Sequence, residues 1–265
     1  MHEFNEWLQA KKKAGISLQN LNGGFHYQRS LPSTNLLAME KLAAGSQEGT
    51  IVLTDHQTRG RGQQGTTWES ADAENLTFSI ILRPVHIEHR LFALSKMVAL
   101  AVQDALSAAC PNEEVLIKWP NDILLNRKKV AGILIENQWE GGRIKGTVAG
   151  IGLNVNQVSF SSDLANKATS IALSTGHSFE RKQLLWQLVA SLEKWYETLY
   201  ELSVNVLDRQ YLSVLYGYHE PVAIRWEGGE GSYPLLGVND RGHIAVQLPG
   251  EIRHFDLKEI EFLLP

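Results

Sequence analysis

The chain has 265 residues, of which 43% are hydrophobic and 20% charged, and 25 Lys and Arg against 29 Asp and Glu give a net charge of −4. A chain of this length forms one large domain or two unequal ones, and its composition is that of a globular protein rather than a disordered or fibrous one. The mildly acidic balance argues against a protein that binds nucleic acid through the phosphate backbone. The single cysteine, Cys110, excludes an internal disulfide and a cysteine-rich metal site, and we expect a cytoplasmic protein.

The sequence also argues against a membrane protein. Residues 1–20 contain three lysines but no apolar stretch after them, so they lack the pattern of a signal peptide. The most apolar long segment, residues 91–110, is interrupted by Ser95, Lys96, Gln103 and Asp104. A membrane span needs about 20 predominantly apolar residues with few charges. We therefore expect no membrane span.

The first part of the chain predicts a short helix and two strands. Residues 1–25 form a polar N-terminal extension with no assigned structure. A helix follows Ser33 and Thr34, whose hydroxyls suit a helix start, and it ends before Gly45. Apolar runs at residues 51–53 and 76–82 predict buried strands, and the loop of residues 59–65 between them is rich in glycine.

The middle of the chain predicts two longer helices that enclose several strands. Apolar residues at helical spacing mark helices over residues 91–105 and 180–202. Consecutive apolar runs predict strands at residues 115–119, 123–125, 130–139 and 144–153, and Gly141-Gly142 marks a hairpin between the last two. Residues 26–212 therefore read as one α+β domain.

The last part of the chain has a different pattern, with short apolar runs separated by turns. Short strands are predicted at residues 221–226, 233–238, 243–248 and 252–257, separated by turns that contain glycine. Closely spaced short strands of this kind are typical of a small β-barrel. We assign residues 213–265 to such a module.

A loop dense in glycine gives the strongest local signal. In residues 57–68, three glycines within six positions let the backbone approach a ligand and turn amide N–H groups toward anionic oxygens. Arg61 can bind a carboxylate or a phosphate with two hydrogen bonds. Trp68 offers a flat surface to a base. The alternative is a mobile surface loop with solvated arginines.

The second signal is the sequence KWPND at residues 118–122, between two predicted strands. Lys118, Asn121 and Asp122 have no packing reason to occur together, and the proline favours a loop over a ladder position. A lysine and an aspartate close together suit a nucleoside triphosphate with Mg²⁺, which usually takes one or two protein carboxylates. A surface turn with an incidental ion pair is the alternative.

Two further segments extend these signals. Lys129 ends a short basic run and adjoins an apolar strand, so its side chain can reach a pocket beside that strand, whereas Arg127 and Lys128 read as a solvated turn. The sequence GIGLNVN at residues 150–156 permits close backbone approach, and Asn154 offers a donor and an acceptor. Asn156 alone reads as a capping or turn residue.

These four segments together resemble the catalytic domain of the biotin protein ligases. KWPND followed by RKKVAGILIE is the most specific piece, followed by the loop GRG-x-x-G-x-x-W and then by STN and GIGLNVN. The resemblance extends over about residues 26–265. It implies an α+β fold of the class II synthetase type, with a mixed, mainly antiparallel sheet flanked by helices and a C-terminal barrel of the SH3 type.

The resemblance also implies a two-step reaction. The carboxylate of biotin attacks the α-phosphate of ATP and gives biotinyl-5′-adenylate and pyrophosphate, with Mg²⁺ present. A lysine of a biotin carboxyl carrier domain then attacks the mixed anhydride. Alignment of two bound reactants contributes on the order of 7–11 kcal/mol, so positioning can outweigh acid–base chemistry here.

Site residues carried over from the resemblance fall into overlapping sets. The residues expected at biotin are Ser33, Thr34, Asn35, Gln57, Gly60, Arg61, Gly62, Gln63, Lys129 and Gly132. Those expected at ATP or the adenylate are Trp68, Lys118, Asn121, Asp122 and Asn154, and Asp122 is the candidate Mg²⁺ ligand. The residues expected to act in catalysis are Arg61, Lys118 and Lys129.

The sequence departs from the family pattern at two places. Gln63 and Thr66 stand where many members have arginine, so we expect weaker retention of the adenylate. The chain also has too few residues before the catalytic domain for a helix-turn-helix, so we expect a ligase without repressor activity, with no nucleic acid partner. The sequence leaves open whether it is a monomer or a homodimer.

Two rival functions remain at this stage. A lipoate or octanoate ligase or transferase on the same fold would use a related pocket and also serve carrier lysines. A regulator that binds biotin or a nucleotide without catalysis belongs to a different class. KWPND with the glycine-rich loop favours the biotin ligase.

Overall fold

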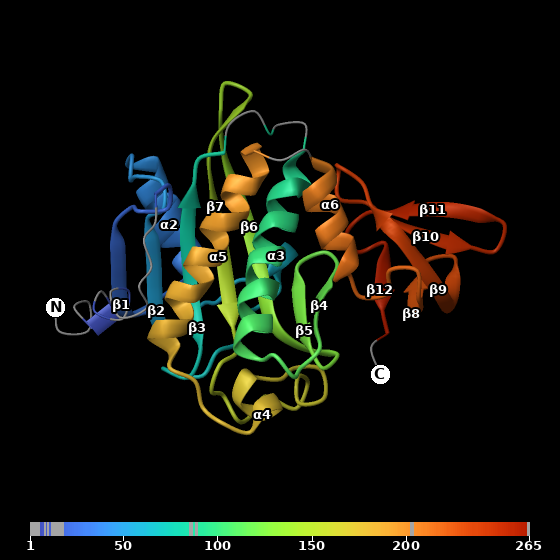
Figure 1. Cartoon of the computed structure of the whole chain (residues 1–265), viewed down its shortest axis with the longest axis horizontal. Helices are drawn as coiled ribbons and strands as arrows, with labels where there is room; N and C mark the ends of the chain where they lie inside the picture. The colour runs from blue at the N-terminus through green and yellow to red at the C-terminus, as the bar shows by residue number, and fades with distance from the viewer. Residues whose placement is uncertain are drawn as a thin grey trace.

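A computed structural model describes residues 6, 7, 9, 11, 19–84, 87, 90–201 and 204–263. Within this part of the chain a large sheet lies beside a smaller one (Figure 1). The large sheet has the strand order β1-β2-β3-β7-β6-β5-β4. Its strands are β1 (Phe25–Leu31), β2 (Ile51–Gln57), β3 (Leu76–Leu82), β4 (Val115–Lys118), β5 (Asp122–Leu125), β6 (Lys128–Glu140) and β7 (Arg143–Leu153).

Only one pair of neighbouring strands in this sheet is parallel. β1 and β2 run in the same direction, joined through α2 (Thr34–Ala43), and every other neighbouring pair is antiparallel. The sheet is therefore mixed and mainly antiparallel, and helices flank it. This confirms the fold class expected from the sequence.

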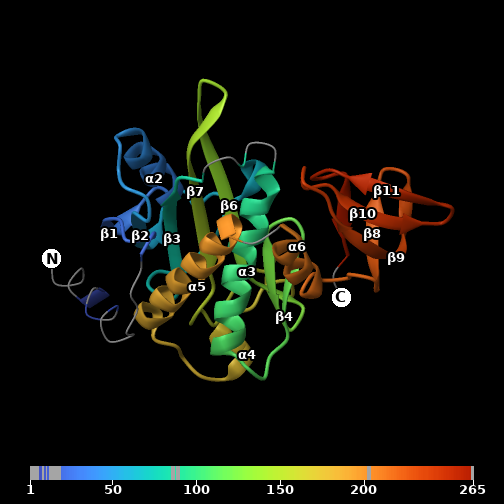
Figure 2. The same cartoon turned by 45° about the horizontal axis from the view of Figure 1, so that its top comes forward.

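Strand alternation divides the sheet into two unequal faces. On β2, Ile51 and Leu53 join the main core, whereas Val52 points to the opposite face. The main core lies under α3 (Leu91–Ala109) and α5 (Arg181–Glu201), which cover one face of the sheet, as Figure 2 shows from a second direction. The other face carries α2 over a small cluster that contains Leu42 and Val148. Beyond α2 this second face has no covering helix in the described residues.

The helix α3 corrects one step of the sequence interpretation. On length and composition alone this helix could cross a membrane, since its mean hydropathy is 1.4. The four polar residues within it therefore do not exclude a span by themselves. In the structure 67% of an 18-residue apolar stretch of this helix is buried inside the protein, so its apolar composition is explained by packing in the core.

The described part of the N-terminal extension packs against the catalytic domain. Trp7 and Leu21 are buried in the main core, and the indole Nε1 of Trp186 on α5 donates to the Trp7 carbonyl at 2.7 Å. The backbone N–H groups of Gln19 and Asn20 donate to the Glu193 carboxylate, also on α5. The extension thus contributes to the same core as residues 26–212.

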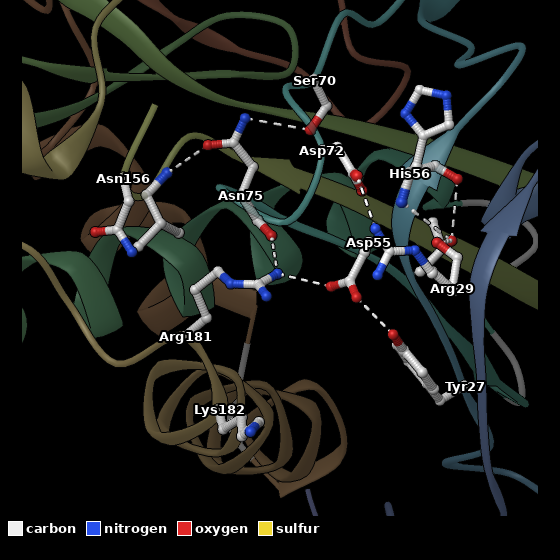
Figure 3. Close-up of polar contacts among 12 residues, drawn as sticks. Tyr27, Arg29, Asp55, His56, Ser70, Asp72, Asn75, Asn156, Arg181 and Lys182 are labelled. Carbon is white, nitrogen blue, oxygen red and sulfur yellow. Dashed lines mark hydrogen bonds and ion pairs between the residues drawn. The ribbon is translucent and has the colours of Figure 1, made fainter. Parts of the chain in front are cut away.

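A polar network holds the start of α5 against the sheet (Figure 3). Arg181 Nη1 donates to Asp55 Oδ1 at 2.9 Å and to the Asn75 carbonyl at 2.9 Å. The Tyr27 hydroxyl donates to the other Asp55 oxygen at 2.5 Å. Asp55 lies two residues before the end of β2, and Asn75 immediately precedes β3. The network therefore fixes both ends of the segment between β2 and β3, which contains the glycine-rich loop.

The smaller sheet forms the C-terminal module. It has the order β11-β10-β9-β8-β12. Its strands are β8 (Pro221–Trp226), β9 (Gly229–Val238), β10 (Ile244–Leu248), β11 (Glu251–Phe255) and β12 (Ile260–Phe262). All of its pairs are antiparallel, consistent with the expected SH3-like barrel. Its buried residues are continuous with the main core.

Specific contacts attach this module to the catalytic domain. The buried Trp119 donates through Nε1 to the Gly242 carbonyl at 2.8 Å. Lys96 on α3 is 3% exposed, and its Nζ contacts Asp208 at 2.7 Å and the Val238 carbonyl at 3.0 Å. Asp208 lies on α6 (Val204–Ser213), so the helix, the sheet and the module share one interface.

Candidate functional site

A cavity of about 610 Å³ lies on the face of the sheet that α2 only partly covers. Its floor is formed by β6 and β7, and the start of α2 closes one end. The glycine-rich loop lies over it, while the KWPND loop and the C-terminal module form the remaining wall.

Most residues predicted for the site line this cavity. They are Ser33, Thr34, Asn35, Gln57, Arg61, Gly62, Gln63, Trp68, Lys118, Asn121, Asp122, Lys129 and Gly132. They come from positions 33 to 132, and the fold brings them together at the point where α2 begins and β5 and β6 meet the loop.

Two of the predicted residues do not line the cavity. Gly60 is buried, and a Cβ atom there would lie 2.2 Å from the Trp68 carbonyl oxygen, so this glycine lets the two arms of the loop approach each other. Asn154 is 3% exposed, and its Nδ2 donates to the Thr169 carbonyl at 3.0 Å. Its side chain therefore joins β7 to the segment before α4 (Ile171–Thr175), away from the cavity.

Uncharged polar groups gather at the α2 end of the cavity. The Thr34 backbone N–H donates to Gln57 Oε1 at 2.7 Å, which fixes the orientation of the Gln57 amide. The Ser79 hydroxyl donates to Asn35 Oδ1 at 2.6 Å and lies 2.8 Å from Thr34 Oγ1. Ser33, Thr34, Asn35 and Ser79 are all buried. This end can recognise a neutral group that has both donors and acceptors.

Three glycines leave the floor of the cavity without side chains. Gly132 on β6 pairs with Gly152 on β7, and Gly150 pairs with Leu134. A Cβ atom on Gly150 would lie 2.0 Å from Asn35 Oδ1, and one on Gly152 would lie 2.3 Å from the indole of Trp68. The glycines thus allow Asn35 and Trp68 to lie directly on the sheet, and no larger residue fits there without displacing them.

A carboxylate and two lysines occupy the opposite side of the cavity. Asp122 Oδ1 lies 2.6 Å from Lys129 Nζ, and Asp122 Oδ2 lies 3.1 Å from Lys118 Nζ. Burial would by itself raise the pKa of Asp122, but the attraction of Lys129 and Lys118 outweighs it and holds that pKa below its usual value. Two lysines share one carboxylate, so one net positive charge remains beside the cavity.

This arrangement does not suit Asp122 as a metal ligand. Both of its oxygens already face ammonium groups, and a cation would have to displace them. Asn121, which was predicted at ATP or the adenylate, donates through Nδ2 to the Ile133 carbonyl at 2.9 Å. The described residues contain no group of three or more His, Cys, Asp or Glu that could hold a metal ion.

Arg61 reaches the cavity from the glycine-rich loop. Its Nη2 lies 2.9 Å from Glu136 Oε1, and its side chain is 42% exposed. Glu136 was not predicted from the sequence, although strand alternation places it on the same face of β6 as Gly132 and Leu134. Alternation along β6 was thus the signal that could have identified it. Ser79 on β3 was also missed, because its place in the site comes from pairing with Gly150 on β7, a contact that local spacing does not record.

The C-terminal module supplies a further wall of the cavity, which was not predicted. The lining residues from this module are Leu257, Lys258, Ile260, Glu261 and Phe262. Lys118 Nζ lies 5.4 Å from the centre of the Phe262 ring, which places β12 directly against the KWPND loop. No spacing or motif in residues 257–262 points to this contact, because it joins segments far apart in the chain.

The chain is similar in sequence to known biotin ligases. Residues 27–154 match the profile of the biotin/lipoate A/B protein ligase family. The biotin–[acetyl-CoA-carboxylase] ligase of Paracoccus denitrificans is 32% identical over 234 residues, which cover 87% of this chain and 97% of that protein. The bifunctional ligase/repressor BirA of Bacillus spizizenii is 30% identical over 255 residues, 96% of this chain and 78% of the relative.

Solved structures show the same fold. The biotin protein ligase of Aquifex aeolicus in complex with biotin and ATP superposes with a TM-score of 0.76 at 24% identity, covering 91% of this chain and 99% of that one. The biotin protein ligase of Leishmania major in complex with biotinyl-5-AMP gives a TM-score of 0.58 at 24% identity, with 88% and 99% covered. By sequence and by fold, this chain belongs to the biotin protein ligase family of enzymes.

Proposed function

We propose that this chain activates biotin with ATP to biotinyl-5′-adenylate and transfers the biotinyl group to a lysine of a biotin carboxyl carrier domain. The observation that carries the proposal is the polarity of one continuous cavity. A buried, uncharged polar cluster lies at the α2 end, and cationic side chains lie at the other.

The uncharged end fits the ureido ring of biotin. This cyclic urea has one carbonyl acceptor and two N–H donors, and it needs partners of both kinds once it leaves water. Because Gln57 Oε1 is engaged by Thr34, its Nε2 remains to donate, and it donates to no residue in the described ranges. Ser33 adds a hydroxyl that can donate or accept, whereas the Thr34 hydroxyl already donates to Gln57 Oε1 and accepts from Ser79.

The cationic end fits the reacting groups. Attack of a carboxylate on a phosphate brings two anions together, so positive charge around them lowers the barrier. Lys118, Lys129 and Arg61 are placed to supply it, and binding of both reactants in one cavity favours their aligned encounter. The new bond joins a biotin carboxylate oxygen to the α-phosphorus, and the bond to pyrophosphate breaks.

The second step requires a carrier lysine as an uncharged amine. Its nitrogen attacks the acyl carbon of the mixed anhydride, an amide forms, and AMP leaves. We propose a carboxylase carrier domain as the acceptor, in keeping with the names of the relatives. We also propose that this chain acts without transcriptional repression and without a nucleic acid partner.

The proposal assigns no protein carboxylate to Mg²⁺. Asp122 is engaged by two lysines, so the metal would enter as the complex of ATP and be held by the phosphates. The residues of this chain would then bind the remaining negative charge.

ATP–pyrophosphate exchange, run separately with biotin, lipoate and octanoate, tests this function. We expect exchange that depends on biotin and is at least about tenfold slower with the other two acids, since neither has a ureido group to satisfy the buried polar cluster. Exchange with lipoate or octanoate and none with biotin would instead assign the chain to the other branch of its family.

A further inference from the structure

One carboxylate links the two ends of the cavity. Glu136 on β6 accepts a hydrogen bond from Arg61 Nη2 at Oε1 and one from Asn35 Nδ2 at Oε2, both at 2.9 Å. Asn35 belongs to the uncharged cluster and Arg61 to the cationic side. Glu136 therefore couples the position of the Asn35 amide to the position of the Arg61 guanidinium.

The chemistry at this position requires a carboxylate. Both partners of Glu136 are donors, and an ionised carboxylate accepts at both oxygens. Glutamine has the same size but would turn its NH₂ group toward either Asn35 or Arg61, so one hydrogen bond would become a contact between two donors. Aspartate keeps two acceptors but is one methylene shorter, so it cannot keep both contacts at the same length.

The amide of Asn35 is held entirely by groups of this chain. Its Nδ2 donates to Glu136 and to the Leu134 carbonyl at 3.2 Å, and its Oδ1 accepts from Ser79. The side chain is 3% exposed and lies on Gly150. Loss of the acceptor at Glu136 would leave a buried donor unpaired, which favours rotation of the amide and a change at the uncharged end of the cavity.

Arg61 is held in a different way. Glu136 binds only one of its nitrogens, and the other guanidinium N–H groups donate to nothing in the described part of the chain. The ion pair thus orients Arg61 toward the cavity while its remaining donors can bind an anion. The pair is partly exposed, with 42% and 26% of the two side chains accessible, so its main effect is on geometry rather than on stability.

We propose that Glu136 is a positioning residue for biotin activation, holding Asn35 at the ureido end and Arg61 at the carboxylate end of the same ligand. The inference rests on the proposed function. Glu136 touches neither reactant in this assignment and acts only through its two partners.

The main test is the Glu136→Gln variant, with Glu140→Gln as its matched control. Glu140 lies on the same strand, is 69% exposed and pairs with Lys145 outside the cavity. We expect Glu136→Gln to raise the KM for biotin in ATP–pyrophosphate exchange about tenfold, because a hydrogen bond to a charged group is lost, while the KM for ATP changes by less than about twofold. Glu140→Gln should match the natural protein in both.

Further variants separate the effect of the Asn35 contact from that of the Arg61 contact. Release of biotinyl-adenylate without an acceptor should be about tenfold faster in Glu136→Gln, and Glu136→Asp should fall between the two proteins. In an Arg61→Ala background, Glu136→Ala, which leaves no side-chain acceptor for Asn35, should add little to adenylate release but still raise the KM for biotin.

Several outcomes would overturn the inference. One is a KM for biotin that is unchanged in Glu136→Gln and Glu136→Asp. Another is a lowered melting temperature with unchanged kinetic constants, which would show a purely structural role. Should Glu136→Gln fail to fold, Glu136→Asp gives the same readouts. Failure of the natural protein to exchange with biotin would instead reject the proposed function, so the two failures are distinguishable.

Discussion

Asp122 places a negative charge in the wall of the cavity, where two lysines compensate it. Its side chain is 14% exposed, and those of Lys118 and Lys129 are 17% and 35% exposed. A partly buried ion pair contributes little to the free energy of unfolding when it is compared with apolar residues in place of all its partners. Removal of one partner alone is destabilising, because it leaves a buried charge without compensation. The stability of the protein should therefore depend on the ionisation of this one carboxyl.

The pH dependence of this contribution has a definite sign. The pKa of Asp122 in the folded protein lies below the ordinary value of 3.8 because the attraction of the lysines outweighs burial. The charged form thus stabilises the fold above about pH 4, and this stabilisation is lost as the pH falls through the folded pKa. Asp122→Asn should reduce the free energy of unfolding by about 2 kcal/mol at pH 7, less than for a fully buried pair because Lys129 is one third exposed.

Urea unfolding of Asp122→Asn and the natural protein between pH 7 and pH 3 measures this effect. The difference between the two should shrink below about pH 4. The matched control is Asp72→Asn, since Asp72 is 51% exposed and pairs with Arg29, and its effect should stay below about 0.5 kcal/mol. A difference for Asp122→Asn that is constant across the range would contradict the assignment of the charge.

At the scale of elements, the glycine-rich loop folds back on itself over the cavity. The Gly62 N–H donates to the Thr66 carbonyl at 2.7 Å, and the backbones of Arg61 and Thr67 form an isolated antiparallel β-bridge. A short 3₁₀ turn, η1 (Gln63–Gly65), lies between the two arms and places Gln63 in the lining of the cavity. Gln63, at a position where many family members carry arginine, thus lines the cavity.

Substitution of Gln63 by arginine should therefore slow the release of the adenylate. A guanidinium there adds a charged donor near the phosphate, and we expect release without acceptor to become about five- to tenfold slower. The matched control is Thr58→Arg, which adds the same charge to the same loop at an exposed position that does not line the cavity. Release as slow from the natural protein as from Gln63→Arg would show that Gln63 already retains the adenylate.

The elements that the sequence predicted are those with a clear apolar period. The strands β2, β3, β6 and β7 and the helices α3 and α5 were confirmed, because burial on one or both faces leaves that period in the sequence. The strand β1 was missed, since it lies at the sheet edge and only Leu31 in it is buried. The helix α6 and the short strand β12 depend on contacts between distant segments, which local spacing does not record.

The same limit applies to the site. Residues in motifs, such as Lys118 and Lys129, could be predicted because their chemistry has no packing explanation. Asn154 has equally suggestive chemistry, but its side chain is used to join two backbone segments. Lys258 has no motif around it, and only the docking of the C-terminal module brings it to the cavity.

At the scale of the whole molecule, the module is a part of the site and not an appendage. Gly242, with a φ of +91°, lets the β9–β10 turn fit against α3, since a Cβ atom there would lie 2.6 Å from the Phe92 ring. The Trp119 indole holds the same turn by its hydrogen bond to the Gly242 carbonyl. The KWPND loop and the module are thus fixed relative to each other, and residues 257–262 form a wall beside Lys118.

Lys258 gives this wall a positive charge. It lies in the turn before β12, lines the cavity and pairs with no acidic side chain in the described residues. Lys258→Ala should raise the KM for ATP about three- to tenfold and leave the KM for biotin unchanged, because an exposed cation near a phosphate chain contributes modestly. Lys258→Arg should restore the natural value. Equal KM values for ATP in Lys258→Ala and the natural protein would place the triphosphate away from the module.

The backbone at Lys258 provides a control that separates charge from conformation. Its φ is +69°, a left-handed conformation that costs a non-glycine residue roughly 1–2 kcal/mol. Lys258→Gly removes the charge and relieves this cost, so it should be more stable than Lys258→Ala while raising the KM for ATP to the same extent. If the KM instead followed the backbone strain, Lys258→Ala would match the natural protein and only Lys258→Gly would differ, and the turn would act by shaping the wall. Lys258→Arg keeps both the charge and the strained backbone, Lys258→Ala removes only the charge, and Lys258→Gly removes both, so the three variants together assign the effect on nucleotide binding to the positive charge.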